Sequence, residues 1–247
     1  MVHASAEKLF ENWDEALIWS CLQGHMGTMM TDDASRPKSA MIVIGDFCFC
    51  AGIPSEDLLR SIDGYKLFIP KDEAWQALIE HTFAQKATKR LRYAIKKESG
   101  IFDKNKLQSF IASLDADYEL RMFDAEIFKL AQSESWSADL CAQFADYMDY
   151  QNRAIGVAIL HGGSLVAGAS PYAVFDHGIE IEIDTKPEYR GKGLATVCGA
   201  KLILECLSRN IEPSWDAHDL RSVHLAEKLG YHLSHPYVTY ERMAESQ

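Results

Sequence analysis

GIEIEIDTKPEYRGKGLATVCGAKLILECL, residues 178–207, predicts a strand, a basic glycine turn and a helix in immediate succession. Ile179, Ile181 and Ile183 alternate with acidic residues, which is the period-two pattern of a strand with two unlike faces. Pro187 ends this strand because proline lacks the N–H group that a central ladder requires. The apolar residues after the turn recur at the spacing of one helix face, so this part is expected to be helical.

The turn between the strand and the helix is suited to bind an anion. It consists of Arg190, Gly191, Lys192 and Gly193, directly before the helix. The first N–H groups of a helix have no partner within it, and the helix dipole favours negative charge there. The turn therefore predicts an anion site, and a diphosphate would suit it best.

The composition is that of a globular protein with an acidic surface. The chain has 247 residues, of which 47% are hydrophobic and 25% charged, and its formal net charge is −11. This charge disfavours nucleic acid and anionic membranes as partners, so we expect neither. The six cysteines form no CxxC pair and the nine histidines no HExxH motif, so we expect no metal. Because the first helix-like run is too acidic for a signal peptide, we expect a cytoplasmic protein.

The first half of the chain predicts a small α/β domain of unknown role, residues 1–115. Helical spacing or capping residues predict helices over 6–22, 54–62, 72–81 and 103–114. Alternation predicts strands over 41–44, 47–51, 65–69 and 88–97, with a hairpin turn at Gly45-Asp46. The strand over 88–97 has a cationic face, which we interpret as a solvated edge strand rather than a binding surface.

The second half predicts another domain, residues 116–247. Strands are expected over 118–122, 155–160, 165–169, 179–184, 212–217 and 237–241. Helical segments are expected over 125–150, with a break near 133–137, and over 194–207 and 219–229. Asp219 is the expected N-cap of the last helix and Gly230 its stop.

Two common phosphate-binding motifs do not fit the turn. A Rossmann fingerprint needs a third glycine, but Thr196 occupies that position, and the turn does not follow its strand directly. A Walker A loop needs Ser or Thr after the lysine, whereas Gly193 follows Lys192. Both motifs are therefore excluded.

The segment Tyr189–Ala195 resembles the acetyl-CoA pyrophosphate loop of the GNAT N-acetyltransferases. Arg190, Gly193 and Ala195 fall on that family's pattern, Arg/Gln-x-x-Gly-x-Gly/Ala. The resemblance continues from about residue 118 to 241 in the order of elements. The sequences WDA at 215–217, SVHLAEKLGY at 222–231, Ser39-Ala40 and Gly45-Asp46-Phe47 are similar to the branch that includes zwittermicin-resistance acetyltransferases.

The resemblance implies a fold, a cosubstrate and a set of binding residues. The fold would be α/β (α+β), with a C-terminal mixed sheet flanked by helices and a smaller N-terminal α/β domain before it. Acetyl-CoA would enter between two diverging strands, where backbone groups of Ile183 and Thr185 meet its pantetheine arm. The implied binding residues are Ile183, Asp184, Thr185, Arg190, Gly191, Lys192, Gly193, Leu194, Ala195, Asp219 and Ser222.

The catalytic groups are less determined by the sequence. Transfer to an amine requires a base, and Glu182, Glu180 and His218 are the candidates, in that order. For both glutamates, a purely structural role on an alternating strand is an open alternative. Ala226 stands where many members of the family have the tyrosine that protonates the leaving thiolate. Another group (Tyr231, Ser222 or water) would have to protonate the thiolate, or it leaves unassisted.

The resemblance predicts an acetyl-CoA-dependent N-acetyltransferase that acts on an amine of a small molecule by direct attack in a ternary complex. Two alternatives stay open: a non-catalytic acyl-CoA sensor and a protein N-acetyltransferase. The expected partners are the small-molecule amine acceptor and, as an open alternative, a second copy of the chain in a homodimer.

Overall fold

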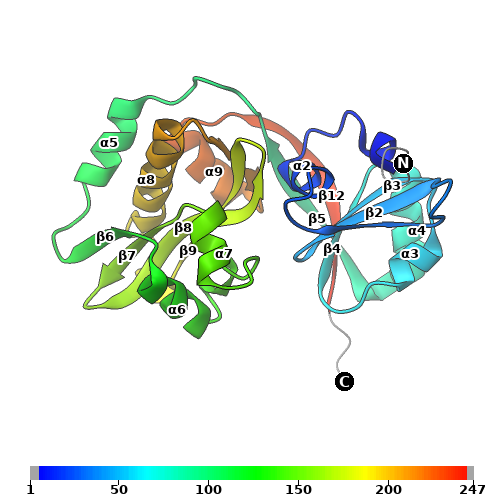
Figure 1. Cartoon of the computed structure of the whole chain (residues 1–247), viewed down its shortest axis with the longest axis horizontal. Coiled ribbons are helices and arrows are strands. Elements are labelled where there is room, and N and C mark those ends of the chain that lie inside the picture. Colours follow the sequence, from blue (N-terminus) through cyan, green and yellow to red (C-terminus); the bar gives the residue numbers. More distant parts are fainter. Residues whose placement is uncertain (1–5, 244–247) are drawn as a thin grey trace. The chain divides into compact units, whose positions relative to one another are not determined.

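A computed structural model describes residues 6–243. The chain forms two compact units (Figure 1). The first unit contains the chain up to Arg92 and again from Pro236. The second unit contains Tyr93–His235. The chain therefore passes between the units twice, through the strands β5 (Ala87–Ile95) and β12 (Leu233–Arg242).

The second unit is built on a mixed five-stranded sheet of order β10-β9-β8-β7-β6. Its strands are β6 (Tyr118–Met122), β7 (Val157–His161), β8 (Ser164–Phe175), β9 (Gly178–Thr185) and β10 (Glu212–Ser214). The pairs from β6 to β9 are antiparallel, and β10 runs parallel to β9. The predicted hairpin and the predicted strand–turn–helix order are confirmed, although β8 is longer than expected.

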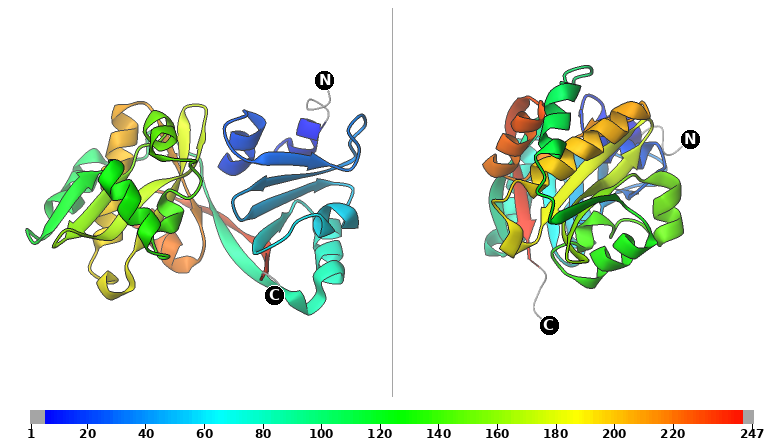
Figure 2. Two further views of the ribbon diagram at one scale, coloured as in Figure 1. Left: turned by 60° about the horizontal axis from the view of Figure 1, so that its bottom comes forward. Right: turned by 90° about the vertical axis from the view of Figure 1, so that its left-hand side faces the viewer.

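Helices cover both faces of this sheet (Figures 1 and 2). They are α5 (Lys104–Ala112), α6 (Ala125–Ser133), η3 (Ala138–Leu140), α7 (Tyr147–Arg153), η4 (Pro187–Tyr189), α8 (Leu194–Ser208) and α9 (Leu220–Leu229). Gly199 of α8 lies against Ile183, whereas Gly168, the partner of Asp184, lies against Leu140 of η3. Since successive residues of β9 point to opposite faces, α8 and η3 cover opposite sides.

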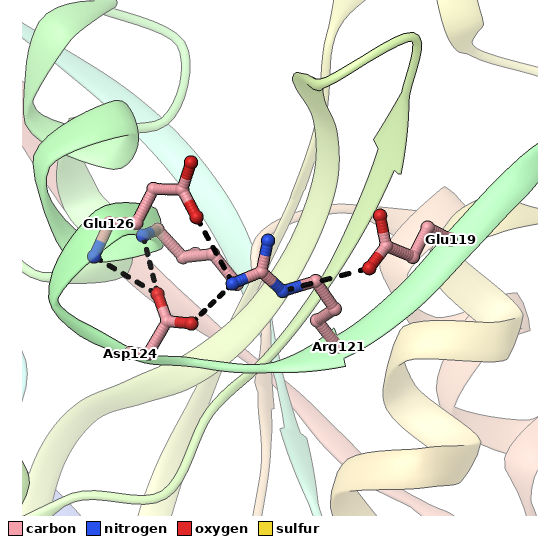
Figure 3. Close-up of polar contacts among 5 residues, drawn as sticks. Glu119, Arg121, Asp124 and Glu126 are labelled. Atoms are coloured by element: carbon pink, nitrogen blue, oxygen red, sulfur yellow. Dashed lines mark hydrogen bonds and ion pairs between the residues drawn. The ribbon is translucent and has the colours of Figure 1, made fainter.

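The start of α6 is fixed by an ion-pair cluster around Arg121 of β6 (Figure 3). Its guanidinium pairs with Asp124, with Glu126 at 3.1 Å and with Glu119 at 3.9 Å. Asp124 is also the N-cap of α6, where its carboxylate accepts from the N–H groups of Glu126 and Ile127. This exposed cluster anchors α6 to the outermost strand of the sheet.

The strand predicted over 212–217 is in fact two short strands with different partners. β10 pairs with β9, whereas β11 (Asp216–Ala217) pairs with Tyr93 and Ala94 of β5. The chain turns at Trp215, whose buried ring packs against Tyr231. The expectation of one continuous strand was wrong. The side chains keep alternating through the change of partner strand, so the sequence pattern does not reveal the break.

The first unit contains the larger part of the second sheet, whose strand order is β1-β2-β3-β4-β12-β5-β11. Its other strands are β1 (Thr28–Thr31), β2 (Ser39–Ile44), β3 (Phe47–Gly52) and β4 (Lys66–Pro70). Its helices are η1 (Lys8–Phe10), α2 (Ala16–Leu22), α3 (Glu56–Arg60), α4 (Glu73–Phe83) and η2 (Ala84–Lys86). Trp75, Ile79 and Phe83 of α4 pack with Phe68 and Tyr240 in one buried core.

Four details of the first unit differ from the expectation. The helix predicted over 6–22 is broken between η1 and α2, because Asn12 has φ of +60° and the Glu15 side chain caps α2. The strand β5 lies between β12 and β11, so it is not the edge strand that we expected. The strand β1 has no counterpart among the predicted strands. Finally, β12 pairs with β4 of the first unit at Tyr240 and Phe68.

The fold class is confirmed as α/β, with mixed sheets flanked by helices. The compact units divide the chain differently from the predicted domains 1–115 and 116–247. Residues 93–115, which include α5, belong to the second unit, and residues from 236 belong to the first. Contacts between α5 and α8 explain the first of these placements.

Gly52 provides a test of the first unit. A Cβ at Gly52, where φ is +82°, would lie 2.2 Å from the carbonyl oxygen of Lys38. Gly24 has nearly the same φ, +79°, but nothing lies within 4 Å. Both alanine substitutions cost about 1–2 kcal/mol for the left-handed backbone, and only Gly52→Ala adds overlap of about 1–3 kcal/mol. We expect Gly52→Ala to be the more destabilising by that difference in urea unfolding; equal losses would contradict this packing.

Candidate active site

The two parallel strands β9 and β10 separate after a short ladder. Pairing between β9 and β10 ends at Glu180 and Ser214, whereas β9 remains paired with β8 as far as Thr185. From residue 181 to 185, the edge of β9 away from β8 therefore has no partner strand in the described part of the chain. Backbone polar groups at such an edge need other partners, so this edge is available to a ligand that can form hydrogen bonds.

The glycine turn follows directly and is open. Gly191 and Gly193 have φ of +76° and +82°, and nothing lies within 4 Å of the position of a Cβ at either residue. Gly193 is the N-cap of α8, and no side chain caps this helix. Among residues 6–243, we find no acceptor for the N–H groups of Lys192 and Gly193. The turn therefore presents unused donors at a helix N-terminus, as the sequence predicted.

The cations of the turn are held by contacts with neighbouring elements. Arg190 Nε donates to the carbonyl oxygen of Thr185 at 3.2 Å, next to the unpaired end of β9. Lys192 Nζ lies 4.7 Å from the centre of the Tyr189 ring. The Tyr189 hydroxyl lies 3.0 Å from Nδ1 of His161 on β7. Both cations are exposed at the turn, and each contacts a neighbouring residue.

The predicted binding residues on β9 lie on the unpaired part of the strand. Ile183 packs toward α8, and Thr185 accepts the bond from Arg190. Asp184 is half-buried on the opposite face. Burial raises its pKa from the ordinary 3.8 to about 7, the charge of Asp139 adds to the rise, and Arg190 opposes it. In the turn and the first residues of α8, Leu194 is buried and Ala195 half-buried.

The other two predicted binding residues already have structural roles. Asp219 is the N-cap of α9, as predicted, where it accepts from the N–H of Ser222 at 3.0 Å and pairs with Arg221. The Ser222 hydroxyl accepts from the indole N–H of Trp215 at 3.1 Å. Their assignment to acetyl-CoA stays a prediction.

The catalytic candidates lie in very different surroundings. Glu180 is only 4% exposed, and its carboxylate accepts from the Ser214 hydroxyl at 2.5 Å and from the backbone N–H of Asp216. Burial raises its pKa, while Lys97, whose Nζ lies 3.8 Å away, opposes the rise. Glu182 is half-buried on the unpaired part of β9, and His218 is exposed beyond β11. Lys97 was not among the predicted site residues, because it lies far along the chain from Glu180 and no sequence pattern relates the two.

Three residues of the site bear on how the leaving thiolate would gain a proton. Ala226 is fully buried in α9, so it serves packing. Tyr231 is buried and donates to the Pro213 carbonyl at 2.7 Å, and burial raises its pKa well above the ordinary value. Its proton is therefore held away from solvent. Ser222, whose oxygen accepts one bond, still has a hydroxyl proton to donate.

Neither a metal cluster nor a membrane helix is found in the described chain. Over residues 6–243, no group of three or more His, Cys, Asp or Glu side chains is close enough to hold a metal ion. In the same residues, no helix combines the length and the apolar character needed to cross a membrane.

The raised pKa of Asp184 predicts a pH dependence of stability. The unfolded chain releases this proton near pH 3.8 and the folded chain near 7, so the folded state binds more protons between these values. Wild-type stability should therefore fall as the pH rises through this window. One pKa unit corresponds to about 1.4 kcal/mol, and solvent screens a half-buried group, so we expect Asp184→Asn to gain about 2 kcal/mol at about pH 8.

Urea unfolding of Asp184→Asn beside the exposed control Asp117→Asn would measure this effect. The gain should decrease as the pH falls below about 7 and be small at about pH 4, close to the pKa of the unfolded carboxyl. A gain that is independent of pH would show that the charge of Asp184 is not its cause.

Known proteins are similar to this chain along nearly its whole length. The sequence model for "GNAT acetyltransferase" matches residues 7–240. The uncharacterized N-acetyltransferase YdfB of Bacillus subtilis is 25% identical over 260 residues, which cover 96% of this chain and 95% of that protein. A crystal structure of a GCN5-related N-acetyltransferase-like protein from Streptococcus suis is 41% identical, covers 97% of this chain and 98% of its own, and superposes with a TM-score of 0.94.

A more distant structure shows the fold alone. The GCN5-related N-acetyltransferase from Kribbella flavida is 12% identical, with a TM-score of 0.55 over 100% of this chain and 95% of its own. The matches span both compact units, so the N-terminal unit is as much a part of the shared architecture as the strand, turn and helix at 178–207. This chain belongs to the GNAT acetyltransferase family.

Proposed function

We propose that this protein is an acetyl-CoA-dependent N-acetyltransferase that transfers the acetyl group to an amine of a small molecule. The observation that carries the proposal is the unpaired edge of β9 over residues 181–185, which leads directly into the open glycine turn. Membership of the GNAT family supports acyl transfer from acetyl-CoA. The acceptor is inferred only from the resemblance to the zwittermicin-resistance branch, which favours an amino-bearing antibiotic.

The turn and β9 would hold different parts of acetyl-CoA. The backbone N–H groups from Gly191 to Ala195 would bind the diphosphate, with Arg190 and Lys192 adding charge-assisted contacts. The amides of the pantetheine arm would pair with the backbone of Ile183 and Thr185, at the edge that β10 leaves unpaired. The ligand would then complete the hydrogen bonding of this edge.

Glu182 is the best-placed general base. Glu182 is half-buried beside the unpaired edge of β9, whereas Glu180, two residues earlier, lies on the paired part of the strand and is only 4% exposed. In the proposed step the Glu182 carboxylate takes a proton from the acceptor amine, directly or through water, and the amine nitrogen bonds to the thioester carbonyl carbon. The carbon–sulfur bond then breaks, and the thiolate takes a proton from water, directly or relayed through the Ser222 hydroxyl, which regains a proton from that water. Glu182 then releases its proton to solvent.

One observation favours a second candidate, a non-catalytic acyl-CoA sensor. Ala226 cannot donate a proton, and the hydroxyl of Tyr231 is buried against the Pro213 carbonyl. A protein lacking a general acid could bind acetyl-CoA without turning it over. Acetylation of a protein amine is a third candidate function. It differs from the first only in the acceptor, which would be a protein and not a small molecule.

Binding of acetyl-CoA can be tested in the turn by calorimetry. Gly193→Asp places a carboxylate among the donors, and Arg190→Glu reverses a charge, so we expect each to raise Kd by about 10–100-fold. Gly100→Asp is the matched control, because Gly100 is also a positive-φ glycine (+73°) with nothing within 4 Å. An unchanged Kd in both turn variants would show that the cofactor site is elsewhere.

Turnover can be tested with acetyl-CoA, a panel of small amines, and release of free thiol as the readout. We expect thiol release with at least one amine, and a drop in kcat of about 10²–10⁴-fold in Glu182→Gln with little change in the Kd for acetyl-CoA. Glu119→Gln, which alters an exposed carboxylate on β6, serves as the control. Saturable binding without thiol release on any amine would favour the sensor instead.

A further inference from the structure

Lys97 lies at the point where β9 and β10 separate. Its Nζ donates to Ser214 Oγ at 2.5 Å and to the Trp215 carbonyl oxygen at 3.3 Å, and it lies 3.8 Å from Glu180 Oε2. The lysine side chain is only 11% exposed. It follows β5, within the second unit, and is far in sequence from the other residues of the site.

Where the backbone pairing between β9 and β10 stops, the side chains of Lys97 and Glu180 form hydrogen bonds to the segment that follows β10. Ser214 is the last residue of β10 paired with β9, and Asp216 already pairs with β5. Between them, the Ser214 hydroxyl and the Asp216 N–H donate to Glu180, and the Trp215 carbonyl accepts from Lys97. Two side chains thus bind the segment that leaves the sheet.

The two charges depend on each other. Glu180 and Ser214 are 4% and 2% exposed, so a carboxylate without its cation would be buried and unpaired, which costs more than losing the pair together. Asp216 adds a further negative charge nearby, which increases the need for Lys97. Removing either partner alone should therefore disturb the end of the ladder more than removing both.

We propose that Lys97 is a positioning residue for acetyl transfer. With Glu180 and Ser214 it fixes the closed end of the divergence between β9 and β10, and so sets where the acetyl end of acetyl-CoA rests relative to Glu182. This inference depends on the proposed function, because it assigns a place to the acetyl group of that ligand. It gives Glu180 a structural role and places no proton transfer on it.

The first test compares two ligands on Lys97→Met by calorimetry. Acetyl-CoA would contact both the turn and the divergent strands, whereas adenosine 3′,5′-bisphosphate has no pantetheine arm and would contact the turn alone. We expect Kd for acetyl-CoA to rise at least about tenfold and Kd for the bisphosphate to stay within about twofold. Gly193→Asp should weaken both ligands, which separates the two parts of the site.

The second test asks whether the charges act as a pair. We expect the double variant Lys97→Met/Glu180→Gln to regain acetyl-CoA affinity to within about threefold of wild type, and Lys97→Arg to remain close to wild type. The double variant also keeps the proposal testable if Lys97→Met alone does not fold. If Glu180→Gln alone abolishes thiol release while acetyl-CoA still binds normally, Glu180 is a catalytic group and the structural role assigned to it is overturned.

The remaining outcomes are equally distinct. Unchanged acetyl-CoA affinity in Lys97→Met, or an equal loss for both ligands, would overturn the role of Lys97. Thiol release by the wild-type protein would uphold the proposed function in the same experiment. If wild-type protein binds neither ligand, the proposed function fails, and the place of the acetyl group fails with it.

Discussion

The ladder between β9 and β10 has only three residue pairs, and this short length is the constraint on which the rest of the site depends. Parallel strands satisfy each other's backbone groups only as far as they run together. Beyond Glu180, β9 continues to Thr185 with β8 as its only partner strand among residues 6–243, and the open turn and α8 follow at once. The candidate site is therefore mainly a continuous backbone surface, which explains why few side chains identify it.

The parts of this fold that depend on neighbouring residues could be predicted from the sequence. The alternating isoleucines predicted β9, and Asp219 and Gly230 predicted the two ends of α9. The conformation of Gly193 follows from the same local logic, since a positive φ at a helix start favours glycine. In each case the cause and the structure lie within a few residues of one another, so one sequence suffices to connect them.

The parts that depend on distant partners could not be predicted. Lys97 and Ser214 are 117 residues apart, and no periodicity relates them. The break at Trp215 is equally hidden, because β10 and β11 differ in partner and not in side-chain pattern. The same holds for β12, which has the alternation of a closing strand but pairs with β4. Pattern predicts which residues form a strand, whereas long-range packing decides which strand lies beside it.

Glu180 and Glu182 show that long-range packing can also separate a structural from a catalytic role. They are identical residues on the same face of one strand, so the sequence alone could not separate a structural role from a catalytic one. Fixed donors at Ser214 and Asp216 hold the buried carboxyl group of Glu180. Glu182 lies one strand repeat further on, about 6.6 Å along β9. The ladder ends between these two residues. A glutamate therefore holds the departing backbone segment at position 180 and, as we propose, takes the proton of the acceptor amine at position 182.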